Sequence, residues 1–316
     1  MAEPAPILTL TLNPALDMAT EVAEIIPGHK LRCSDPLLDP GGGGLNVSRA
    51  IRALGGDSLA LVALGGLTGD RLAGLIRAGG VTFLSILGPG ETRQSLTVTE
   101  ASTGKQYRFM LPGPVWGEAE RARVFTLLRA TSRPGGISVI SGSQPPGVPA
   151  DFPRDLALSM PGSRVVLDTS GTALTEAVRN PIPGLAVLRM DGEEGEGLAG
   201  ASLHSREDTA AFAQSLVHRG VAEHVIIARG ADGNVMADAT SRIFARAAKV
   251  KVRSTVGAGD SFVAAFVLAM SRGQPPAEAL SLGSAAAAAA VMTDATQLCR
   301  PEDVMRLLPE CATISV

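Results

Sequence analysis

The sequence predicts an α/β fold: a doubly wound, mostly parallel sheet with helices on both faces. Short apolar runs rich in branched side chains alternate along the chain with longer amphipathic runs. Strands that are apolar along their whole length are typical of parallel sheets buried between two helical layers. The 36 glycines and 21 prolines supply turns, and 316 residues are enough for a full core. No linker separates two parts, so we expect a single domain over residues 1–316.

The predicted elements follow in chain order. Each expected strand is a short apolar run that ends near a glycine, a proline or a polar residue: 7–12, 59–64, 137–140, 164–167, 186–188 and 224–228. Each expected helix carries apolar residues at helical spacing: 45–54, 69–78, 118–129, 205–219, 258–271, 276–292 and 301–308.

Two stretches break this alternation. Residues 21–39 contain a Pro-Gly turn and short extended pieces. Residues 94–100 and 106–111 are extended runs joined by Ser102, Thr103 and Gly104, which is typical of a β-hairpin. We expect these strands to form a small β-lid outside the main sheet, made of residues of about 18–40 and 91–112.

Composition excludes several classes of function. A net charge of −3 and an aromatic content of 3% disfavour a nucleic-acid-binding surface. Three widely spaced cysteines without a CxxC pair support neither a disulfide framework nor a zinc site. The apolar stretches are too short to span a bilayer, and the first residues lack the pattern of a signal peptide. We therefore expect a cytoplasmic protein with no nucleic-acid or membrane partner.

The strongest candidate site is the segment 254–261, which runs directly into an apolar helix. Gly257, Ala258 and Gly259 at a helix start expose backbone N–H groups to which the helix dipole adds positive potential, so they suit an anion. Asp260 follows in the first turn, where a carboxylate can accept the proton of an attacking hydroxyl. A carboxylate there can also merely complement the helix dipole, and the residues alone leave both interpretations open.

Other residues suit a sugar phosphate. The four glycines at 41–44 let the backbone approach a ligand, although they match neither a Walker A motif nor a dinucleotide fingerprint. Carboxylates accept sugar hydroxyls and arginines grip phosphate, so the candidates are Asp17, Lys30, Arg32, Arg93 and Arg108. Asp191 and Glu194 follow a predicted strand, and they are either outer-sphere magnesium ligands or part of a surface acidic cluster.

Together these residues resemble the ribokinase-like (carbohydrate kinase B) family of sugar kinases. Within that family the chain is most similar to the minor 6-phosphofructokinase type, which is related to 1-phosphofructokinase and tagatose-6-phosphate kinase. The resemblance covers nearly the whole chain. It lies on the motifs TLTLNPALD (9–17), KLRC (30–33), PGGGGLNV (40–47), TRQ (92–94), YRF (107–109), SGSQPPG (141–147), DTSG (168–171) and STVGAGDS (254–261).

The resemblance implies transfer of the γ-phosphoryl group of ATP, with Mg²⁺, to a phosphosugar hydroxyl beneath a lid that also pairs two subunits as a homodimer. It implies that Asp260 is the base beside an anion hole of Gly257, Ala258 and Gly259. Sugar hydroxyls would contact Asp17, Gly42, Gly43, Asn46 and Ser143, and Lys30, Arg93 and Arg108 would lie near the substrate phosphate or the lid. Four glycines at 41–44 favour the 6-phosphofructokinase type, with fructose 6-phosphate as its substrate, over the 1-phosphofructokinase type, which commonly carries a lysine in that loop.

The sequence departs from the family pattern on the nucleotide side. Where the family usually has Lys-Pro-Asn-x-x-Glu, this chain has Arg189, Met190 and Asp191, then Glu194. Ala228 replaces a serine or threonine, Thr293 an asparagine, and Ala295 a glycine. We expect nucleotide contacts from Arg189, Ala228, Arg229, Gly230, Gly233, Thr255 and Thr293, and Mg²⁺ near Asp191 and Glu194.

Three alternatives remain open at this point. The changes on the nucleotide side favour a sugar-phosphate-binding regulator with weakened use of ATP, whereas the intact Asp260 segment disfavours it. A nucleoside kinase of the same fold is disfavoured by the few aromatic residues and the many candidate phosphate-binding cations. Fructose 6-phosphate cannot be separated by sequence from tagatose 6-phosphate, which differs at one stereocentre, or from a 1-phosphofructokinase activity.

Overall fold

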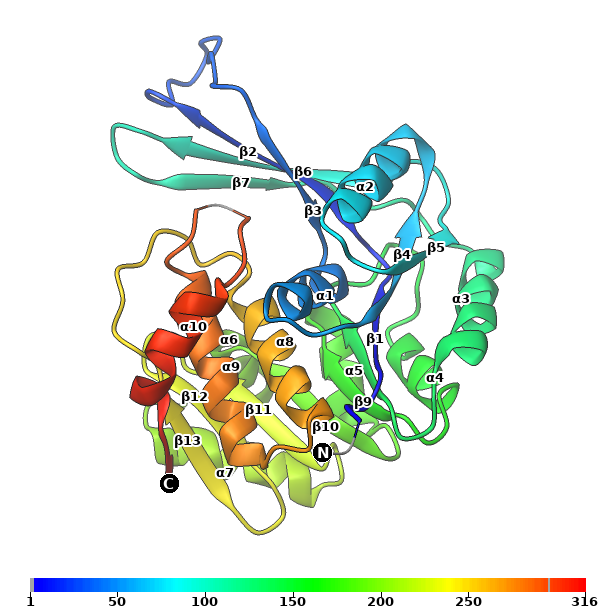
Figure 1. Cartoon of the computed structure of the whole chain (residues 1–316), viewed down its shortest axis with the longest axis vertical. Coiled ribbons are helices and arrows are strands. Elements are labelled where there is room, and N and C mark those ends of the chain that lie inside the picture. Colours follow the sequence, from blue (N-terminus) through cyan, green and yellow to red (C-terminus); the bar gives the residue numbers. More distant parts are fainter. Residues whose placement is uncertain (1–2, 295) are drawn as a thin grey trace.

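A ten-stranded sheet forms the body of the molecule (Figure 1). The computed structural model describes residues 3–294 and 296–316. The strand order is β14-β13-β12-β11-β10-β9-β8-β1-β4-β5. Neighbouring strands from β11 through β10, β9, β8, β1 and β4 to β5 pair in parallel, and β12 to β14 add an antiparallel edge. Their bounds are β1 Ile7–Thr11, β4 Leu59–Leu64, β5 Phe83–Leu87, β8 Ile137–Ser141, β9 Arg164–Asp168, β10 Leu185–Met190, β11 His224–Ala228, β12 Gly233–Ala237, β13 Arg242–Arg246 and β14 Thr313–Ser315.

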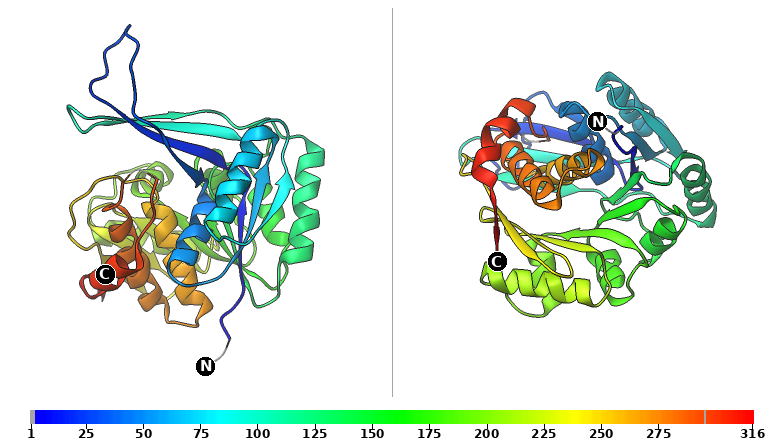
Figure 2. Two further views of the ribbon diagram at one scale, coloured as in Figure 1. Left: turned by 45° about the horizontal axis from the view of Figure 1, so that its top comes forward. Right: turned by 60° about the horizontal axis from the view of Figure 1, so that its bottom comes forward.

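Helices cover both faces of this sheet, so the predicted doubly wound architecture is confirmed (Figure 2). One face packs against α1 Gly43–Ala53, α2 Gly66–Ala78, α8 Ala258–Ser271, α9 Pro276–Ala290 and α10 Pro301–Leu307, which continues as the 3₁₀ turn Leu308–Cys311. The other carries α3 Glu118–Thr131, α4 Phe152–Leu158, α5 Gly171–Arg179, α6 Gly192–Ala199 and α7 Arg206–His218. Among the described residues, no helix combines the length and hydropathy that crossing a membrane requires.

A second, four-stranded sheet of order β3-β2-β6-β7 projects from the carboxyl end of β1 (Figure 1). Its strands are β2 Ala15–Val22, β3 Leu37–Gly41, β6 Arg93–Glu100 and β7 Gln106–Met110. The predicted hairpin is confirmed, because β6 and β7 pair antiparallel across the 101–105 turn. Strands β6 and β7 lie within the segment 91–112 expected to form the lid, and β2 and β3 overlap the segment 18–40 and extend slightly beyond it. Closure over a sugar remains a prediction.

Several short elements differ from the sequence-based expectation. Helices α4, α5 and α6 and strands β5, β12, β13 and β14 were not predicted. Most are short, and α5, α6 and β12 begin at glycine, which reads as a turn. Helix α6 contains glycines at 192, 195 and 197, and it is held at its start by a reciprocal capping box between Asp191 and Glu194. The helices predicted at 258–271 and 301–308 agree with α8 and α10 to within one residue.

Candidate active site

Asp260 lies at the N-terminus of α8, beside the carboxyl edge of the large sheet. The N-cap is Gly257, which has a φ of 75°. The first intrahelical bond runs from the Ser261 N–H to the Gly257 carbonyl at 2.9 Å, so the N–H groups of residues 258–260 have no intrahelical partner. The amide of Asn46, on α1, donates from Nδ2 to Asp260 Oδ2 at 2.9 Å. The predicted base, the predicted anion hole and one predicted sugar contact therefore adjoin one another.

The carboxyl group of Asp260 is tuned toward the physiological range. Burial raises its pKa to about 6, and the nearby negative charge of Asp168 adds to the rise. The hydrogen bond from Asn46 and the charges of Arg189 and Arg49 oppose this rise. A carboxylate whose pKa lies just below neutral pH is ionised at pH 7 and is a stronger base than an exposed aspartate.

Two neighbouring strand ends bring an ion pair close to Asp260. Arg189, at the end of β10, donates from Nη1 to Asp168 Oδ1, at the end of β9, over 3.1 Å. A Cβ atom at Gly259 would come within 2.9 Å of Arg189 Nη1, so the guanidinium lies against the predicted anion hole. Ser141 donates to the other oxygen of Asp168 at 3.0 Å. The substitution of the family's lysine by Arg189 thus keeps a cation beside Asp260.

Asp168 begins the DTSG motif (168–171) that follows the apolar run 164–167, but the sequence assigned it no role at the site. The signal for such a role is a carboxylate at the carboxyl end of a buried parallel strand, because ligands bind there in open α/β sheets. Arg49 was also missed, because a single basic residue inside a helix belongs to no motif.

Asp17 faces this site from the second sheet. Ser95, opposite it on β6, donates its hydroxyl to Asp17 Oδ1. A Cβ atom at Gly41 would come within 2.0 Å of Asp17 Oδ2, so the glycine at this point of β3 leaves room for the Asp17 carboxylate in its present position. Burial raises the pKa of Asp17 above its ordinary value, against the hydrogen bond from Ser95 and the charge of Arg93. Arg93 donates to the Asn13 carbonyl at 3.2 Å. Asp17 and Arg93, two of the predicted substrate contacts, therefore lie where β1 passes into the second sheet.

The remaining substrate candidates are spread over the second sheet and the strand ends. Gly42 and Gly43 connect β3 to α1 and begin the helix that carries Asn46. Ser143 follows β8 and its hydroxyl accepts from Asn13 Nδ2 at 3.2 Å. Arg108 is exposed on β7, and Lys30 and Arg32 are exposed in the 23–36 loop. The structure therefore brings Asp17, Asn46 and Arg93 to the site, whereas Lys30, Arg32 and Arg108 lie farther out on the lid.

Three buried polar atoms at this edge lack a hydrogen-bond partner among the described residues. They are Thr11 Oγ1, Gln144 Nε2 and Arg189 Nε. They follow or end the three parallel strands β1, β8 and β10. Buried polar groups are nearly always paired, so each of these atoms is available to a bound water or a ligand. The unpaired atoms and the candidate residues thus mark the same edge of the sheet.

Asp191 and Glu194, the candidate magnesium ligands, form the capping box of α6. Asp191 Oδ1 accepts from the Glu194 N–H, and Glu194 Oε2 accepts from the Asp191 N–H, each at 2.9 Å. One oxygen of each carboxylate remains outside this exchange. In the described part of the chain, no cluster of three or more His, Cys, Asp and Glu side chains is arranged to hold a metal ion. Two carboxylates nevertheless suit a hydrated magnesium ion that arrives with nucleotide phosphates.

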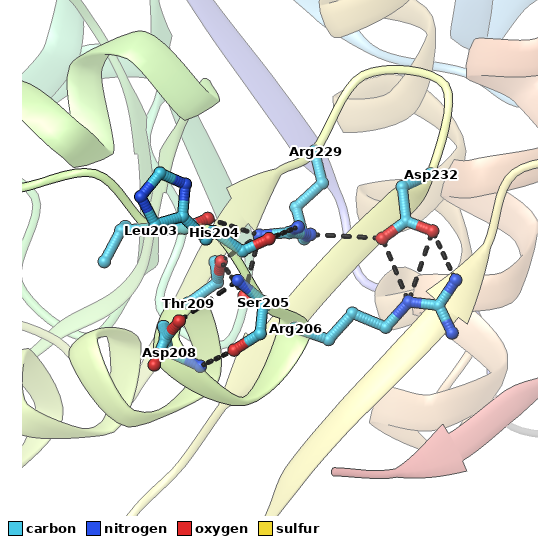
Figure 3. A network of polar contacts seen from close by, with 8 residues as sticks. All are labelled: Leu203, His204, Ser205, Arg206, Asp208, Thr209, Arg229 and Asp232. Carbon is cyan, nitrogen blue, oxygen red and sulfur yellow. Dashed lines mark hydrogen bonds and ion pairs between the residues drawn. The ribbon is translucent and has the colours of Figure 1, made fainter.

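The Arg229 side chain is engaged by the protein itself (Figure 3). Its guanidinium donates to the carbonyls of Leu203 and Ser205 at 2.9 Å and of His204 at 3.0 Å. It also donates from Nε to Asp232 at 3.1 Å. An arginine with this many protein acceptors holds the 203–209 segment. In this structure the Arg229 side chain is committed to these protein acceptors, and its contact with the nucleotide stays a prediction.

The other predicted nucleotide residues lie on three loops. Gly230 lies in the turn between β11 and β12, and Ala228 and Gly233 are the strand residues on either side of it. The turn is closed by a bond from the Arg229 N–H to the Gly233 carbonyl at 2.8 Å. Thr255 is exposed in the loop before α8. The Thr293 hydroxyl lies 2.7 Å from the Ala290 carbonyl and 2.9 Å from the Gln297 carbonyl, so it stabilises its own loop. Ala295 lies outside the described residues.

Comparisons with known proteins agree with this geometry. The chain is 39% identical over 302 residues to the ATP-dependent 6-phosphofructokinase isozyme 2 of Mycobacterium tuberculosis, a match that covers 95% of this chain and 88% of that protein. It is 32% identical over 307 residues to the 1-phosphofructokinase of Bacillus subtilis, covering 96% and 98%. The crystal structure of phosphofructokinase-2 from Escherichia coli in complex with substrates and products has a TM-score of 0.91 to this chain at 36% identity, covering 97% of this chain and 99% of that one.

The family comparison covers most of the chain. The sequence model of the pfkB family of carbohydrate kinases matches residues 12–303. This range includes the second sheet, Asp260 and the ends of β9 and β10 that carry Asp168 and Arg189. The predicted resemblance to ribokinase-like sugar kinases is therefore confirmed, and the chain belongs to the pfkB family of carbohydrate kinases.

Proposed function

We propose that this chain transfers the γ-phosphoryl group of ATP to the 1-hydroxyl of fructose 6-phosphate, giving fructose 1,6-bisphosphate and ADP. The observation that carries the proposal is the position of Asp260, between the free N–H groups at the start of α8 and the Asn46 amide. Identity to the 6-phosphofructokinase of M. tuberculosis exceeds identity to the 1-phosphofructokinase of B. subtilis, 39% against 32%. The glycine run 41–44, which carries no lysine, supports the same substrate.

The geometry supports a division of labour in the transfer. Asp260 accepts the proton of the attacking sugar hydroxyl as the new O–P bond forms and the bond to the leaving ADP oxygen breaks. The N–H groups of residues 258–260 stabilise charge that develops on the transferring group. Arg189 adds a fixed positive charge against Gly259, where a planar guanidinium can follow phosphoryl oxygens more closely than the family's lysine.

We further propose that Mg²⁺ enters with ATP and is held through water by the free oxygens of Asp191 and Glu194. The cation would neutralise phosphate charge, and the two carboxylates would keep it oriented toward α6. Burial raises the pKa of Glu194 above its ordinary value, and the negative charges of Asp191 and Asp168 contribute to the rise. A cation at this place would relieve that accumulation of charge.

Recognition of the substrate phosphate is assigned to Arg93, with Lys30, Arg32 and Arg108 approaching when the lid closes. Arg93 is fixed beside Asp17, so it can hold the phosphosugar from the lid side. Asp17 would accept hydrogen bonds from the sugar hydroxyls, and Asn46 would donate to them. Tagatose 6-phosphate would place one hydroxyl differently among these contacts and remains the alternative substrate. A cytoplasmic location is part of the same proposal.

The second sheet is also the proposed dimer interface. Strands β3 and β7 form its edges, and unpaired edges favour association with another chain. An apolar row crosses all four strands through Leu38, Met18, Leu96 and Phe109, on the face opposite to Asp17 and Ser95. Phe109 is 53% exposed in the single chain. A symmetric partner would cover this row and both edges.

An ADP-release assay with purified protein tests the function. Fructose 6-phosphate, tagatose 6-phosphate, fructose 1-phosphate and free fructose are compared at equal concentration, with ATP alone as the blank. We expect fructose 6-phosphate to give the highest kcat/KM, by orders of magnitude over free fructose. Binding of fructose 6-phosphate by calorimetry without any ADP release would instead favour a sugar-phosphate-binding regulator, the reading that the engaged Arg229 and Thr293 side chains favour.

A further inference from the structure

Arg49 lies one helical turn after Asn46 on α1, and its side chain is 18% exposed. Its guanidinium has three acceptors. Nη1 donates to the Pro40 carbonyl at 2.6 Å and to Asn46 Oδ1 at 2.9 Å, and Nη2 donates to Asp39 Oδ1 at 3.2 Å. Two of these acceptors belong to β3 of the second sheet. One side chain thus joins the helix that carries Asn46 to the sheet that carries Asp17.

The contact with Asn46 determines which way that amide points. The amide oxygen of Asn46 accepts from Arg49, so its Nδ2 is directed to Asp260 Oδ2 at 2.9 Å. The reversed amide would set its oxygen against the carboxylate and its NH₂ group against the guanidinium, and both contacts would repel. Arg49 therefore favours the orientation in which Asn46 donates to the base.

The contact with Asp39 extends this arrangement to two other parts of the site. Asp39 pairs across the sheet with Asp17, and its second oxygen accepts from the Thr296 hydroxyl at 2.5 Å. Thr296 belongs to the loop that follows Thr293 on the nucleotide side. The positive charge of Arg49 acts on all three carboxylates, Asp39, Asp17 and Asp260. Its guanidinium is the cation that these three groups share.

We propose that Arg49 is a positioning residue for phosphoryl transfer: it aligns the Asn46 amide with the base and ties that alignment to strand β3 through Asp39. The inference rests on the proposed kinase function. Arg49 touches neither substrate nor nucleotide in this role, and it acts through Asn46 on one side and through Asp39 on the other. A shift of β3 as the lid moves would be felt at the base through this one guanidinium.

The groups that face Asp260 define what loss of Arg49 does. Burial is the largest cause that raises the pKa of Asp260, and the negative charge of Asp168 from β9 raises it further. The positive charges of Arg189 from β10 and Arg49 from α1 lower it. Asn46 lowers it through the hydrogen bond that Arg49 orients. Removing Arg49 weakens two of the influences that favour the ionised form. The pKa of Asp260 then rises. As the pH is lowered, the variant therefore loses activity at a higher pH than the wild type does.

The test is the pH profile of kcat with fructose 6-phosphate for Arg49→Met, which keeps the length of the side chain and removes its charge and donors. Arg52→Met is the matched control, because Arg52 lies on the same helix with its side chain 57% exposed and contacts only exposed Asp57 among the ion pairs of the described chain. For Arg49→Met we expect the acidic limb to move up by about one pH unit, since an opposite charge close by changes a pKa by one or more. The kcat at pH 8 should fall about tenfold because the base is no longer aligned.

Two further variants keep the test decisive if Arg49→Met does not fold. Arg49→Lys keeps the charge but lacks the fork that serves three acceptors, so the limb should move less while kcat still falls several-fold. Asp39→Asn leaves the contacts of Arg49 with Pro40 and Asn46, so its limb should not move up, whereas the KM for fructose 6-phosphate should rise several-fold. A folded Arg49→Met variant whose profile coincides with that of Arg52→Met, or Arg49→Lys with wild-type kcat, would overturn the inference. An inactive wild type would instead count against the proposed function.

Discussion

The most informative perturbation is Asp168→Asn, which removes one negative charge beside Asp260 while keeping the shape of the side chain. Asparagine can still accept the hydrogen bond from Ser141. The ion pair with Arg189, 3.1 Å long in the wild type, loses its charge, so the guanidinium acts more strongly on Asp260. Both changes favour the ionised form of Asp260, and the pKa of Asp260 should fall.

The size of the effect follows from the wild-type value. With the lowering contributions of Asn46, Arg189 and Arg49 included, the pKa of Asp260 is raised from 3.8 to about 6, a net change of roughly 3 kcal/mol. Burial is the larger of the two causes that raise it, so removal of Asp168 should lower the pKa by about one unit, as expected for the loss of one nearby like charge. With ionised Asp260 as the proposed base, wild-type activity should decline as the pH falls through about 6, and the acidic limb of Asp168→Asn should lie at lower pH. A less basic Asp260 and a less firmly held Arg189 should also lower kcat at pH 8 by about tenfold.

The assay is ADP release with saturating fructose 6-phosphate and ATP from pH 5 to pH 9. Asp57→Asn is the control, because this carboxylate is 95% exposed and its ion-pair partner Arg52 is itself exposed. We expect the profile of the control to superpose on that of the wild type. The reasoning is refuted if the acidic limb of Asp168→Asn stays in place or moves to higher pH.

Three other predictions follow from the site and the lid. Arg93→Ala should raise the KM for fructose 6-phosphate at least tenfold with a smaller change in kcat, because this cation binds ground state and transition state alike; equal KM values would contradict its role. Asp191→Asn keeps an N-cap for α6 and removes a charge near the proposed cation, so the dependence of activity on free Mg²⁺ should flatten while the sugar KM is unchanged; superimposable magnesium titrations would make Asp191 a structural cap only. Light scattering at micromolar concentration should show a dimer for the wild type and a monomer for Phe109→Arg, and a fully active wild-type monomer would count against the lid interface.

Local sequence patterns predicted the parts of the fold whose signals are local. The glycines and the apolar run after Gly257 define α8, and the turn at Gly104 defines the hairpin of the second sheet. Helix α6 was missed because its glycines lower helix propensity, whereas its stability comes from the Asp191–Glu194 capping box. The same two residues therefore have a structural role that a ligand-based interpretation did not include.

From the residues alone, the candidate site could be predicted where one short segment carries the chemistry, whereas Asp17, Asn46 and Arg93 were assigned to a common site through the family resemblance. Asp260 and its N–H groups come from consecutive residues, whereas Asp168 and Arg189 meet only because β9 and β10 are neighbours in the sheet. Arg49 gains its importance from Asp39 and Asn46, on either side of a sheet-to-helix junction. The position of the Arg229 side chain depends on the fold of residues 203–209. No pattern in the strand that precedes Arg229 reveals this contact.

The most direct test of the central claim is the turnover of fructose 6-phosphate by Asp260→Asn. The wild type should release ADP and form fructose 1,6-bisphosphate, and the variant should retain sugar binding with kcat lower by roughly 10²–10⁴-fold. The pKa of Asp260 is about 6 in the folded protein and 3.8 in an exposed aspartate. Above pH 6 the carboxyl group is ionised in both states, and its ionised form destabilises the folded state. The Tm of Asp260→Asn at pH 8 should therefore be no lower than that of the wild type. A variant that is as stable as the wild type but has lost turnover would support Asp260 as the base. Near-normal turnover by the folded variant, or a wild type that prefers free fructose, would contradict the account.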